Sequence, residues 1–436
     1  MTMLRKPYLL TTVILLMFLR ITAQDQLVLS LEGARQHALQ HNLTLKNSGL
    51  AISHSGERIR EAIAAGLPQL NSTMDYSNAL GASISIRFNP DAPATEIPIR
   101  PTSNMSLQLS QLLFNANYFV GIEMARIGRD LIEKSYVRTE QEILASVTDS
   151  YYLVLVSEDL LTLLSKNLAN LEEIHRKTAA LEAVGIIEST DVDQLFVQIA
   201  SLRNSVRSSE RQLEMANNML RLVLGASAET QLELTENMNA LLTGVVVESS
   251  VSPIPFQLQQ NLDFQLMDFQ EKLSEQQVRM QRANYLPTLS GFYNRTEKIL
   301  KPDFDTSPQN MLGLRLSIPI FSSGQRNAQV KQALIDLETT RNNKALLADQ
   351  LRIQEKQLQF NLRTALETYT NQLSNLDVSR RVYNNLKLKF EHGLISGLDL
   401  VNADNNYVRA ETDYISAVFQ LLRANVELEK LYGQIN

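Results

Sequence analysis

Few residues of this chain have a type and spacing that suggest catalysis or metal binding. His37 and His41 are four residues apart, so they would share one face of a helix and could ligate a metal ion. The sequence nominates no third ligand, and a solvated helix face accounts for the pair more simply. It contains no phosphate-binding glycine loop, dinucleotide-binding motif, nucleophile elbow or zinc-protease motif. We therefore expect no enzyme activity, no cofactor and no metal site.

Composition excludes further classes of protein. The 436 residues include no Cys, which rules out disulfides, thiol nucleophiles, Cys-ligated metal clusters and a lipid anchor on an N-terminal Cys. The net charge of −6 argues against a nucleic-acid partner bound through positive potential. A hydrophobic share of 44% is ordinary for a folded chain.

Two acidic segments remain as candidate functional sites, and they resemble each other. "GIIESTDV" at 185–192 and "GLISGLDL" at 393–400 each place a Gly six residues before an Asp. The Gly can take the left-handed conformation that ends a helix. Ser189, Thr190 or Asp191 can accept the free N–H groups of a following helix, and Asp399 can do so in the second segment. Each segment therefore predicts the tip of a helical hairpin.

Proline spacing indicates the elements that hold these tips. No Pro occurs between Pro101 and Pro253, or after Pro319. Helix interiors exclude Pro, and both tracts are rich in helix-forming residues with leucines at three- and four-residue steps. A helix from about 116 to 184 would be about 100 Å long at 1.5 Å per residue. The pattern predicts long coiled-coil helices.

Alternating segments indicate a small β part. Alternation of apolar and polar residues occurs in Ser83–Phe88, Met105–Leu109 and Leu312–Ile318, and more weakly in Leu289–Tyr293. The pattern suits strands with one face in lipid and one in a polar lumen, and also soluble hairpins with aromatic cores. The aromatic residues that flank these segments are Tyr76, Phe88, Phe114, Tyr118, Phe119, Phe292, Tyr293 and Phe321.

The chain is an internal repeat. Residues 185–225 align without gaps to 393–433, and "LPQL" at 67–70 matches "LPTL" at 286–289. Each half is predicted to contain a helix, a hairpin, a long helix, a tip and a second helix. The first repeat spans 24–247, with its hairpin at about 70–114, long helix at about 116–184 and second helix at about 190–225. A linker at 248–256 precedes the second repeat at 257–436, with corresponding elements at about 287–321, 323–392 and 397–433.

The N-terminus predicts export. Arg5 and Lys6 precede an apolar run from Leu9 to Leu19, and Ala23 offers a cleavage site, so residues 1–23 are expected to be a signal peptide. No later apolar run reaches 18 residues, so a membrane location would require a β-barrel. Four strands per chain cannot close a barrel, and several chains would have to share one.

The order and duplication of these motifs resemble the TolC-like outer-membrane efflux protein family. The resemblance rests on "LP.L" before each first strand, the "LF" and "PIF" strand ends and the Gly-x-x-x-x-x-Asp tips, and "ALQHNLTLKNS" at 38–48 is similar to the family's N-terminal helix. It implies a mainly α fold with a small β part. The long helices would form a periplasmic α-barrel, and four strands per chain would contribute to a trimeric twelve-stranded outer-membrane β-barrel.

The resemblance also implies partners and a location. The protein would be a homotrimer in the outer-membrane lipid of a Gram-negative bacterium and would extend into the periplasm. It would receive substrate from an inner-membrane transporter of the RND, ABC or MFS type through a periplasmic adaptor. The residues expected to dock the adaptor are Gly185, Ile187, Ser189, Thr190, Asp191, Gly393, Ile395, Ser396 and Asp399.

The second tip departs from the pattern of some members at the periplasmic gate. Those members carry another Asp three positions after the aspartate of the second tip, where this chain has Asn402, and a gate-locking Arg where it has Ile395. A gate held by the same charge network is therefore not expected. Asp399 and Asn402 can still line the constriction, and Asp193 can contribute charge.

Two functional hypotheses follow from these features. The first is an outer-membrane export duct of a tripartite efflux or secretion system. The alternative is an exported coiled-coil structural or adhesive stalk without channel activity, whose hairpins would be soluble caps. Alternating strands bounded by aromatic residues, placed twice at corresponding points, favour the duct.

Overall fold

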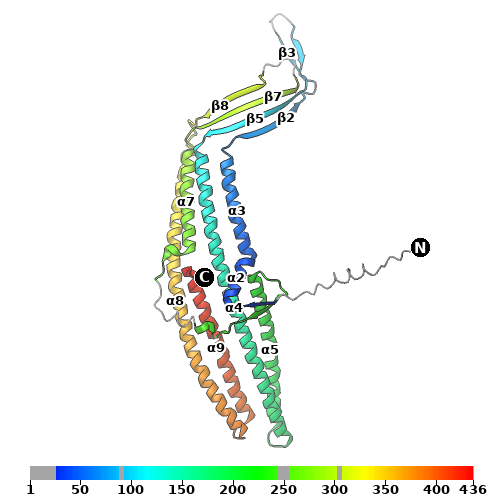
Figure 1. The fold of residues 1–436 in the computed structure, drawn as a ribbon, viewed down its shortest axis with the longest axis vertical. Coiled ribbons are helices and arrows are strands. Elements are labelled where there is room, and N and C mark those ends of the chain that lie inside the picture. Colours follow the sequence, from blue (N-terminus) through cyan, green and yellow to red (C-terminus); the bar gives the residue numbers. More distant parts are fainter. Residues whose placement is uncertain (1–25, 88–92, 239, 244–254, 302–306, 436) are drawn as a thin grey trace, which may run out of the picture. The chain divides into compact units, whose positions relative to one another are not determined.

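The computed structural model describes residues 26–87, 93–238, 240–243, 255–301 and 307–435. The expected signal peptide and most of the expected linker lie outside these residues. The described part is mainly helical (Figure 1) and forms two compact units. Unit 1 is drawn from the described residues within 1–47, 137–261 and 350–436, and unit 2 from those within 48–136 and 262–349. Both sequence repeats contribute to both units.

Four long helices carry most of the fold: α4 (Ala116–Ala183), α5 (Ser189–Leu224), α8 (Gln325–Glu391) and α9 (Gly397–Tyr432). Each boundary lies within two residues of the one expected from sequence. The largest difference is at the start of α8, where Ser323 and Gly324 have φ angles of +48° and +84°. Left-handed residues cannot belong to a right-handed helix, so α8 begins after them.

Each of these helices is followed by a left-handed glycine in an equivalent position. Gly185, Gly225, Gly393 and Gly433 have φ angles of +77°, +73°, +70° and +70°. After α8, the N–H of Gly393 donates to the carbonyl of Phe390, and that of Leu394 donates to Lys389, both at 2.9 Å. The other three ends have the same pair of bonds. This Schellman arrangement satisfies carbonyls that the helix leaves without partners.

Unit 1 has its apolar core along the seam between the long helices. A buried cluster joins residues of α4, α5, α8 and α9. The members of this cluster, called the seam cluster below, are Leu171, Ile174, Leu195, Ile199, Tyr383, Leu400, Val401 and Ala403. The core is narrow because each helix buries only one stripe of its surface.

A small β element in unit 1 was not predicted. β1 (Gln26–Leu29) pairs in parallel with β6 (Gln231–Leu234), beside α2 (Leu31–His41). The fully buried Tyr151 of α4 donates its hydroxyl to the Leu29 carbonyl at 3.2 Å and contacts Glu236 Oε2 at 3.3 Å. Burial raises the pKa of Tyr151, so it remains a hydrogen-bond donor that ties the N-terminal strand to α4.

Unit 2 contains the main sheet. Its antiparallel strands are β2 (Gln69–Ser77), β5 (Thr102–Phe114), β7 (Thr288–Leu300) and β8 (Asn310–Ser317), in the order β2-β5-β7-β8. The two predicted hairpins therefore join edge to edge through β5 and β7 (Figure 1). The outer edges of β2 and β8 have no strand partner within the described part of the chain.

One strand prediction was wrong in its pairing. Ser83–Phe88 was expected to be a strand of the hairpin at about 70–114. Phe88 lies outside the described residues, and β3 (Ser83–Ile86) pairs with β4 (Thr95–Pro98) in a separate two-stranded sheet. The strand beside β5 is β2, which shows no clear alternation in sequence. Ser72 interrupts the apolar positions Leu70, Met74 and Tyr76, so the pattern is weak there.

The main sheet exposes an apolar face. Cross-strand pairing places Leu70, Leu109, Tyr293 and Leu312 in one row across all four strands. Leu70 is 63% exposed and Leu312 82% exposed. Leu314 and Leu316 follow on the same face of β8 and are also exposed. Among the described helices, none combines the length and apolar character needed to cross a membrane.

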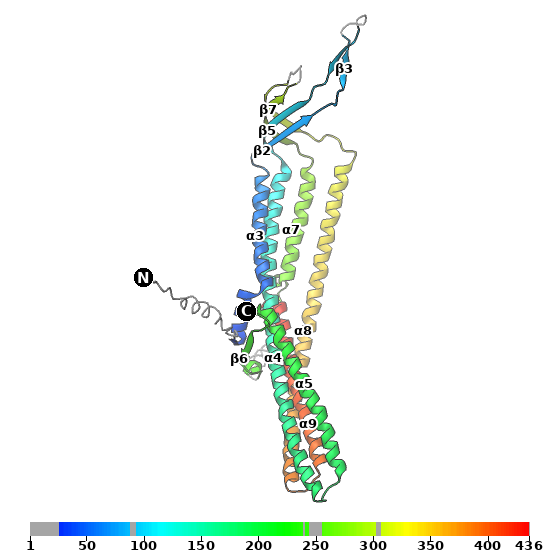
Figure 2. The same ribbon diagram turned by 90° about the vertical axis from the view of Figure 1, so that its right-hand side faces the viewer.

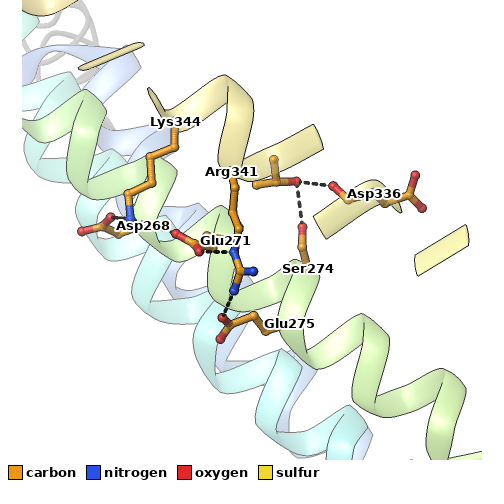
Figure 3. Close-up of polar contacts among 8 residues, drawn as sticks. Asp268, Glu271, Ser274, Glu275, Asp336, Arg341 and Lys344 are labelled. Carbon is orange, nitrogen blue, oxygen red and sulfur yellow. Dashed lines mark hydrogen bonds and ion pairs between the residues drawn. The ribbon is translucent and has the colours of Figure 1, made fainter. Parts of the chain in front are cut away.

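The helices of unit 2 are α7 (Leu262–Ala283), α3 (Leu43–Ala64) after its first turn, and the adjoining parts of α4 and α8. A polar network joins α7 to α8 (Figure 3). Lys344 Nζ lies 2.6 Å from Asp268 Oδ1 and 2.8 Å from Glu271 Oε2. Arg341 reaches Glu271 at 2.9 Å and Glu275 at 3.1 Å.

This network is a property of the second repeat alone. The hydrogen bonds from Lys344 and Arg341 lower the pKa of Glu271, so its contribution to stability is lost as acid protonates it. α3 and α7 have equal lengths of 22 residues, and the α3 positions that match Asp268, Glu271 and Glu275 are Gly49, Ile52 and Gly56. The repeated helices are thus held by different contacts in the two halves.

The glycines after the long helices generate a matched pair of substitutions. Gly393→Ala should cost about 1–2 kcal/mol, because a Cβ there meets nothing within 4 Å and only the left-handed backbone is penalised. Gly225→Ala should cost more, because its Cβ would lie 2.6 Å from the backbone oxygen of His41. The measurement is the thermal unfolding midpoint by circular dichroism. Equal midpoints for the two variants would contradict the packing described at Gly225.

Candidate functional site

The two predicted tips are turns at the same end of unit 1 (Figures 1 and 2). Residues 184–188 connect α4 to α5, and residues 392–396 connect α8 to α9. Gly185 and Gly393 supply the left-handed residue that was predicted for each turn. A Cβ on Gly397 would lie 3.0 Å from Thr178 Oγ1, so the start of α9 packs closely against α4.

The second tip begins its following helix with a complete capping box. Ser396 Oγ accepts the N–H of Asp399 at 3.1 Å, and Asp399 Oδ2 accepts the N–H of Ser396 at 3.2 Å. The Ser396 hydroxyl also donates to Asp399 Oδ2 at 2.7 Å. The predicted capping role of Asp399 is confirmed, and Ser396 shares it. Both side chains are exposed at the surface of the turn.

The first tip lacks this arrangement. Glu188 occupies the N-cap position of α5 and makes no side-chain capping bond. The prediction that Ser189, Thr190 or Asp191 caps this helix was wrong, because α5 already includes all three residues. Thr190 donates instead to Glu188 Oε2 at 3.2 Å. The two tips are therefore alike in their glycine turn and different in how firmly the next helix begins.

The remaining docking and gate candidates fall into two groups by burial. Ile395 packs against the seam cluster, and Ile187 is half-buried. Asp193, Asp399 and Asn402 are exposed. Residues that line a constriction between several chains would have to be exposed in a single chain. Within the single chain, Asp399 is hydrogen-bonded to Ser396.

A buried polar cluster near the tips was not predicted from the sequence. Asp404 of α9 is 2% exposed and accepts hydrogen bonds from the Asn167 side-chain amide of α4 and the Tyr383 hydroxyl of α8. Burial raises the pKa of Asp404 to about 6, against the opposing effect of these two donors. Tyr407 stacks on Tyr383 with ring centroids 5.5 Å apart.

A cavity of about 540 Å³ adjoins this cluster. Its walls include Asp404, Asn167 and residues of α8, and Met238 also lines it. The signal for Asp404 was present in the sequence, because it follows Leu400 by four positions and so occupies the buried stripe of α9. A carboxylate at a core position of a coiled-coil helix could have been singled out on that ground.

The histidine pair is placed as its spacing predicts. His37 and His41 stack with ring centroids 4.1 Å apart on α2. Burial, and then the neighbouring His41, lower the pKa of His37. In the described part of the chain, no group of three or more His, Asp or Glu side chains is arranged to hold a metal ion.

Comparison with known proteins adds the following findings. The chain matches the family model described as "Outer membrane efflux protein" over residues 34–226 and 255–434. It is 22% identical over 424 residues to the outer membrane protein TolC of Escherichia coli K12, covering 92% of this chain and 81% of that protein. It is also 22% identical over 414 residues to the outer membrane efflux protein BepC of Brucella suis, covering 93% and 87%.

The fold agrees with a solved channel. The crystal structure of the Campylobacter jejuni CmeC outer membrane channel superposes with a TM-score of 0.76 and 16% sequence identity, covering 93% of this chain and 85% of that one. The order of helices and strands along this chain is thus that of a known channel fold.

The unequal tips generate a reciprocal prediction. Glu188→Ser should complete a capping box in the first tip, because Asp191 already occupies the position that Asp399 has in the second. Ser396→Ala should remove the second capping box, at a cost of about 1 kcal/mol.

Hydrogen exchange at the two tips measures both effects. The first turn of α5 should exchange more slowly in Glu188→Ser, and the first turn of α9 faster in Ser396→Ala. Each tip is the control for the other, since neither substitution touches the opposite turn. Unchanged exchange at both tips would show that the caps do not limit local opening.

Proposed function

Because the chain belongs to the outer membrane efflux protein family, it is an outer-membrane export duct that extends into the periplasm, and we propose that three copies form one duct. The duct would be the outer component of a tripartite efflux or secretion system. It would pass substrates without catalysis. The alternative of an exported stalk without channel activity is not favoured by this membership.

The main sheet carries the argument for a shared barrel. An apolar row crosses all four strands and is exposed to solvent in the single chain. The edges of β2 and β8 are open in the described chain, and in lipid each unpaired backbone group would cost several kcal/mol. If β8 of one copy pairs with β2 of the next, three copies close a ring of twelve strands, and the apolar row becomes its lipid-facing surface.

The repeat organisation supports the same assembly. We propose the two sequence repeats, 24–247 and 257–436, as the structural units that alternate around the ring. Each repeat supplies two of the strands and one helical hairpin to the wall. A three-fold assembly of duplicated chains therefore offers six similar hairpin tips at its periplasmic end.

The tips are the proposed adaptor-docking surface. Their exposed residues include the polar Ser189, Thr190 and Ser396 and the large apolar Ile186 and Leu394, and each tip carries an aspartate, Asp191 or Asp399. A periplasmic adaptor would seal the duct there to an inner-membrane transporter of the RND, ABC or MFS type. Asp193, Asp399 and Asn402 are the proposed gate residues, and Ile395 adds packing rather than charge.

Light scattering in mild detergent tests the assembly. We expect a protein-only mass of roughly three processed chains, about 140 kDa, against 49.2 kDa for one full chain. The protein should be recovered from the outer-membrane fraction. A monomer in the soluble fraction would overturn the shared barrel and return the stalk to consideration.

A cysteine scan tests the docking surface, since the chain has no native Cys. Thr190→Cys, carrying a photo-crosslinker, should capture the adaptor when both are expressed together. Ser53→Cys, on the exposed face of α3, is the control and should capture little. Equal capture at both positions, or capture only at Ser53, would contradict docking at the tips.

A further inference from the structure

Asp404 is a buried carboxylate that joins three of the long helices. It projects from α9, and its hydrogen-bond donors come from Asn167 of α4 and Tyr383 of α8. All three side chains are less than 10% exposed. The neighbouring residues Leu400, Val401 and Ala403 belong to the seam cluster. The carboxylate therefore lies inside the contact that holds the two hairpins together.

The donors to this carboxylate are uncharged. An amide and a phenol stabilise a buried negative charge less than a cation would, so ionisation of Asp404 weakens the packed seam. The Tyr383 hydroxyl remains a donor, because burial and the nearby Asp404 raise its pKa to about 12. The charge of Lys387 favours the ionised carboxylate, and it does so less than the two hydrogen bonds.

The cavity beside Asp404 could hold water that hydrates the carboxylate in place of its contacts with the helices. Asp404 and Asn167 both line it, and its volume of about 540 Å³ is ample for several water molecules. Its other polar walls would supply partners for that water. Water drawn to an ionised Asp404 would replace the contacts with Asn167 and Tyr383 and separate α9 from α4 and α8.

Other titratable groups surround the site from each helix. They are Asp159, Lys166 and Glu173 of α4, Arg380, Tyr383 and Lys387 of α8, and Tyr407, Glu411 and Tyr414 of α9. Asp159 has a raised pKa through burial and through Glu411, so it also titrates above its ordinary range. A test must therefore separate Asp404 from Asp159.

We propose that Asp404 is a proton-operated latch: the neutral carboxyl closes the seam of α4, α8 and α9, and the ionised carboxylate opens it to water. Asp404 follows Asp399 by five residues, about one and a half helical turns from the tip. The latch therefore lies within two helical turns of the proposed gate residues Asp399 and Asn402. Its effect on export rests on the proposed duct function, whereas its effect on helix packing does not.

The sign of the pH dependence follows from the direction of the shift. The pKa rises from 3.8 to about 6 in the folded chain, so the folded chain holds the proton more tightly than an opened one. The stabilisation is complete below pH 3.8 and is lost as the pH rises through about 6. At acid pH the helices α4, α8 and α9 are therefore packed together, and at neutral pH this packing is weakened.

Hydrogen exchange of the full-length protein in detergent tests the latch. Asp404→Asn is the neutral isostere, and the peptides of interest cover residues 159–170, 373–383 and 404–411. At about pH 7.5 the wild-type peptides should exchange up to about a hundredfold faster than those of Asp404→Asn, because two pKa units are two powers of ten. At about pH 4.5 the difference should fall below about tenfold.

Two further variants complete the design. Asp377→Asn removes an exposed carboxylate of α8 that pairs with Arg381, and should behave as wild type at both pH values. Tyr383→Phe removes a donor that favours the ionised carboxylate, so the pH at which exchange changes should move upward. A residue with only a packing role would not move that midpoint.

The outcomes are distinct. A difference between wild type and Asp404→Asn that grows with pH supports the latch. No difference, or a difference that is the same at both pH values, overturns it. Neither result bears on the trimer, because the mass from light scattering decides that separately.

Discussion

The constraint on which the helical part depends is that a long helix must satisfy its last carbonyls before the chain can reverse. Four glycines with φ angles of +70° to +77° do this at equivalent places in the two repeats. At the tips, each glycine turns the chain within five residues, so the second helix returns along the first. The antiparallel hairpins, and the seam between them, exist because these turns are short and internally hydrogen-bonded.

A seam of this kind is a thin core, so a buried polar residue has a large effect on how the helices pack. In a thick core a buried polar cluster is surrounded by layers of apolar packing, whereas here Asp404, Asn167 and Tyr383 join three helices directly across a single seam. The two repeats also differ in the side-chain contacts that hold their helices. In the described chain, the α3 positions that match the acids of the α7–α8 network (Figure 3) are apolar or Gly, and the first tip has no capping box, although both tips turn at an equivalent glycine. The duplicated chain is thus symmetric in its turns and asymmetric in its side-chain contacts.

Sequence reasoning succeeded where a local rule determines structure. Absence of proline, leucine spacing and the glycines located α4, α5, α8 and α9 to within two residues. It failed where the structure of a segment depends on which other segment it pairs with. Ser83–Ile86 alternates well but pairs with Thr95–Pro98, and β2 alternates poorly but pairs with β5. The N-cap of α5 fell on Glu188, because the turn geometry set by Gly185 fixes where the helix begins, whatever good capping residue follows. Asp404 was not singled out although its position on the buried stripe of α9 was visible in the sequence, and its partners Asn167 and Tyr383 could be identified only from the packing of three helices.

The sheet and the helices place different demands on assembly. The helices satisfy their backbone within each chain, so their assembly requires only matching side chains. The main sheet has two open backbone edges in the described chain and an apolar face. Water can solvate the edges but not the apolar face, and lipid can solvate the apolar face but not the edges. In water the edges are solvated and the leucines of β8 are exposed; in lipid the leucines are solvated and the edges are not. Pairing with further copies of the same sheet, within lipid, satisfies both at once. For that reason we place the requirement for oligomerisation in the β part, and we expect the tips to remain free to change partners and packing.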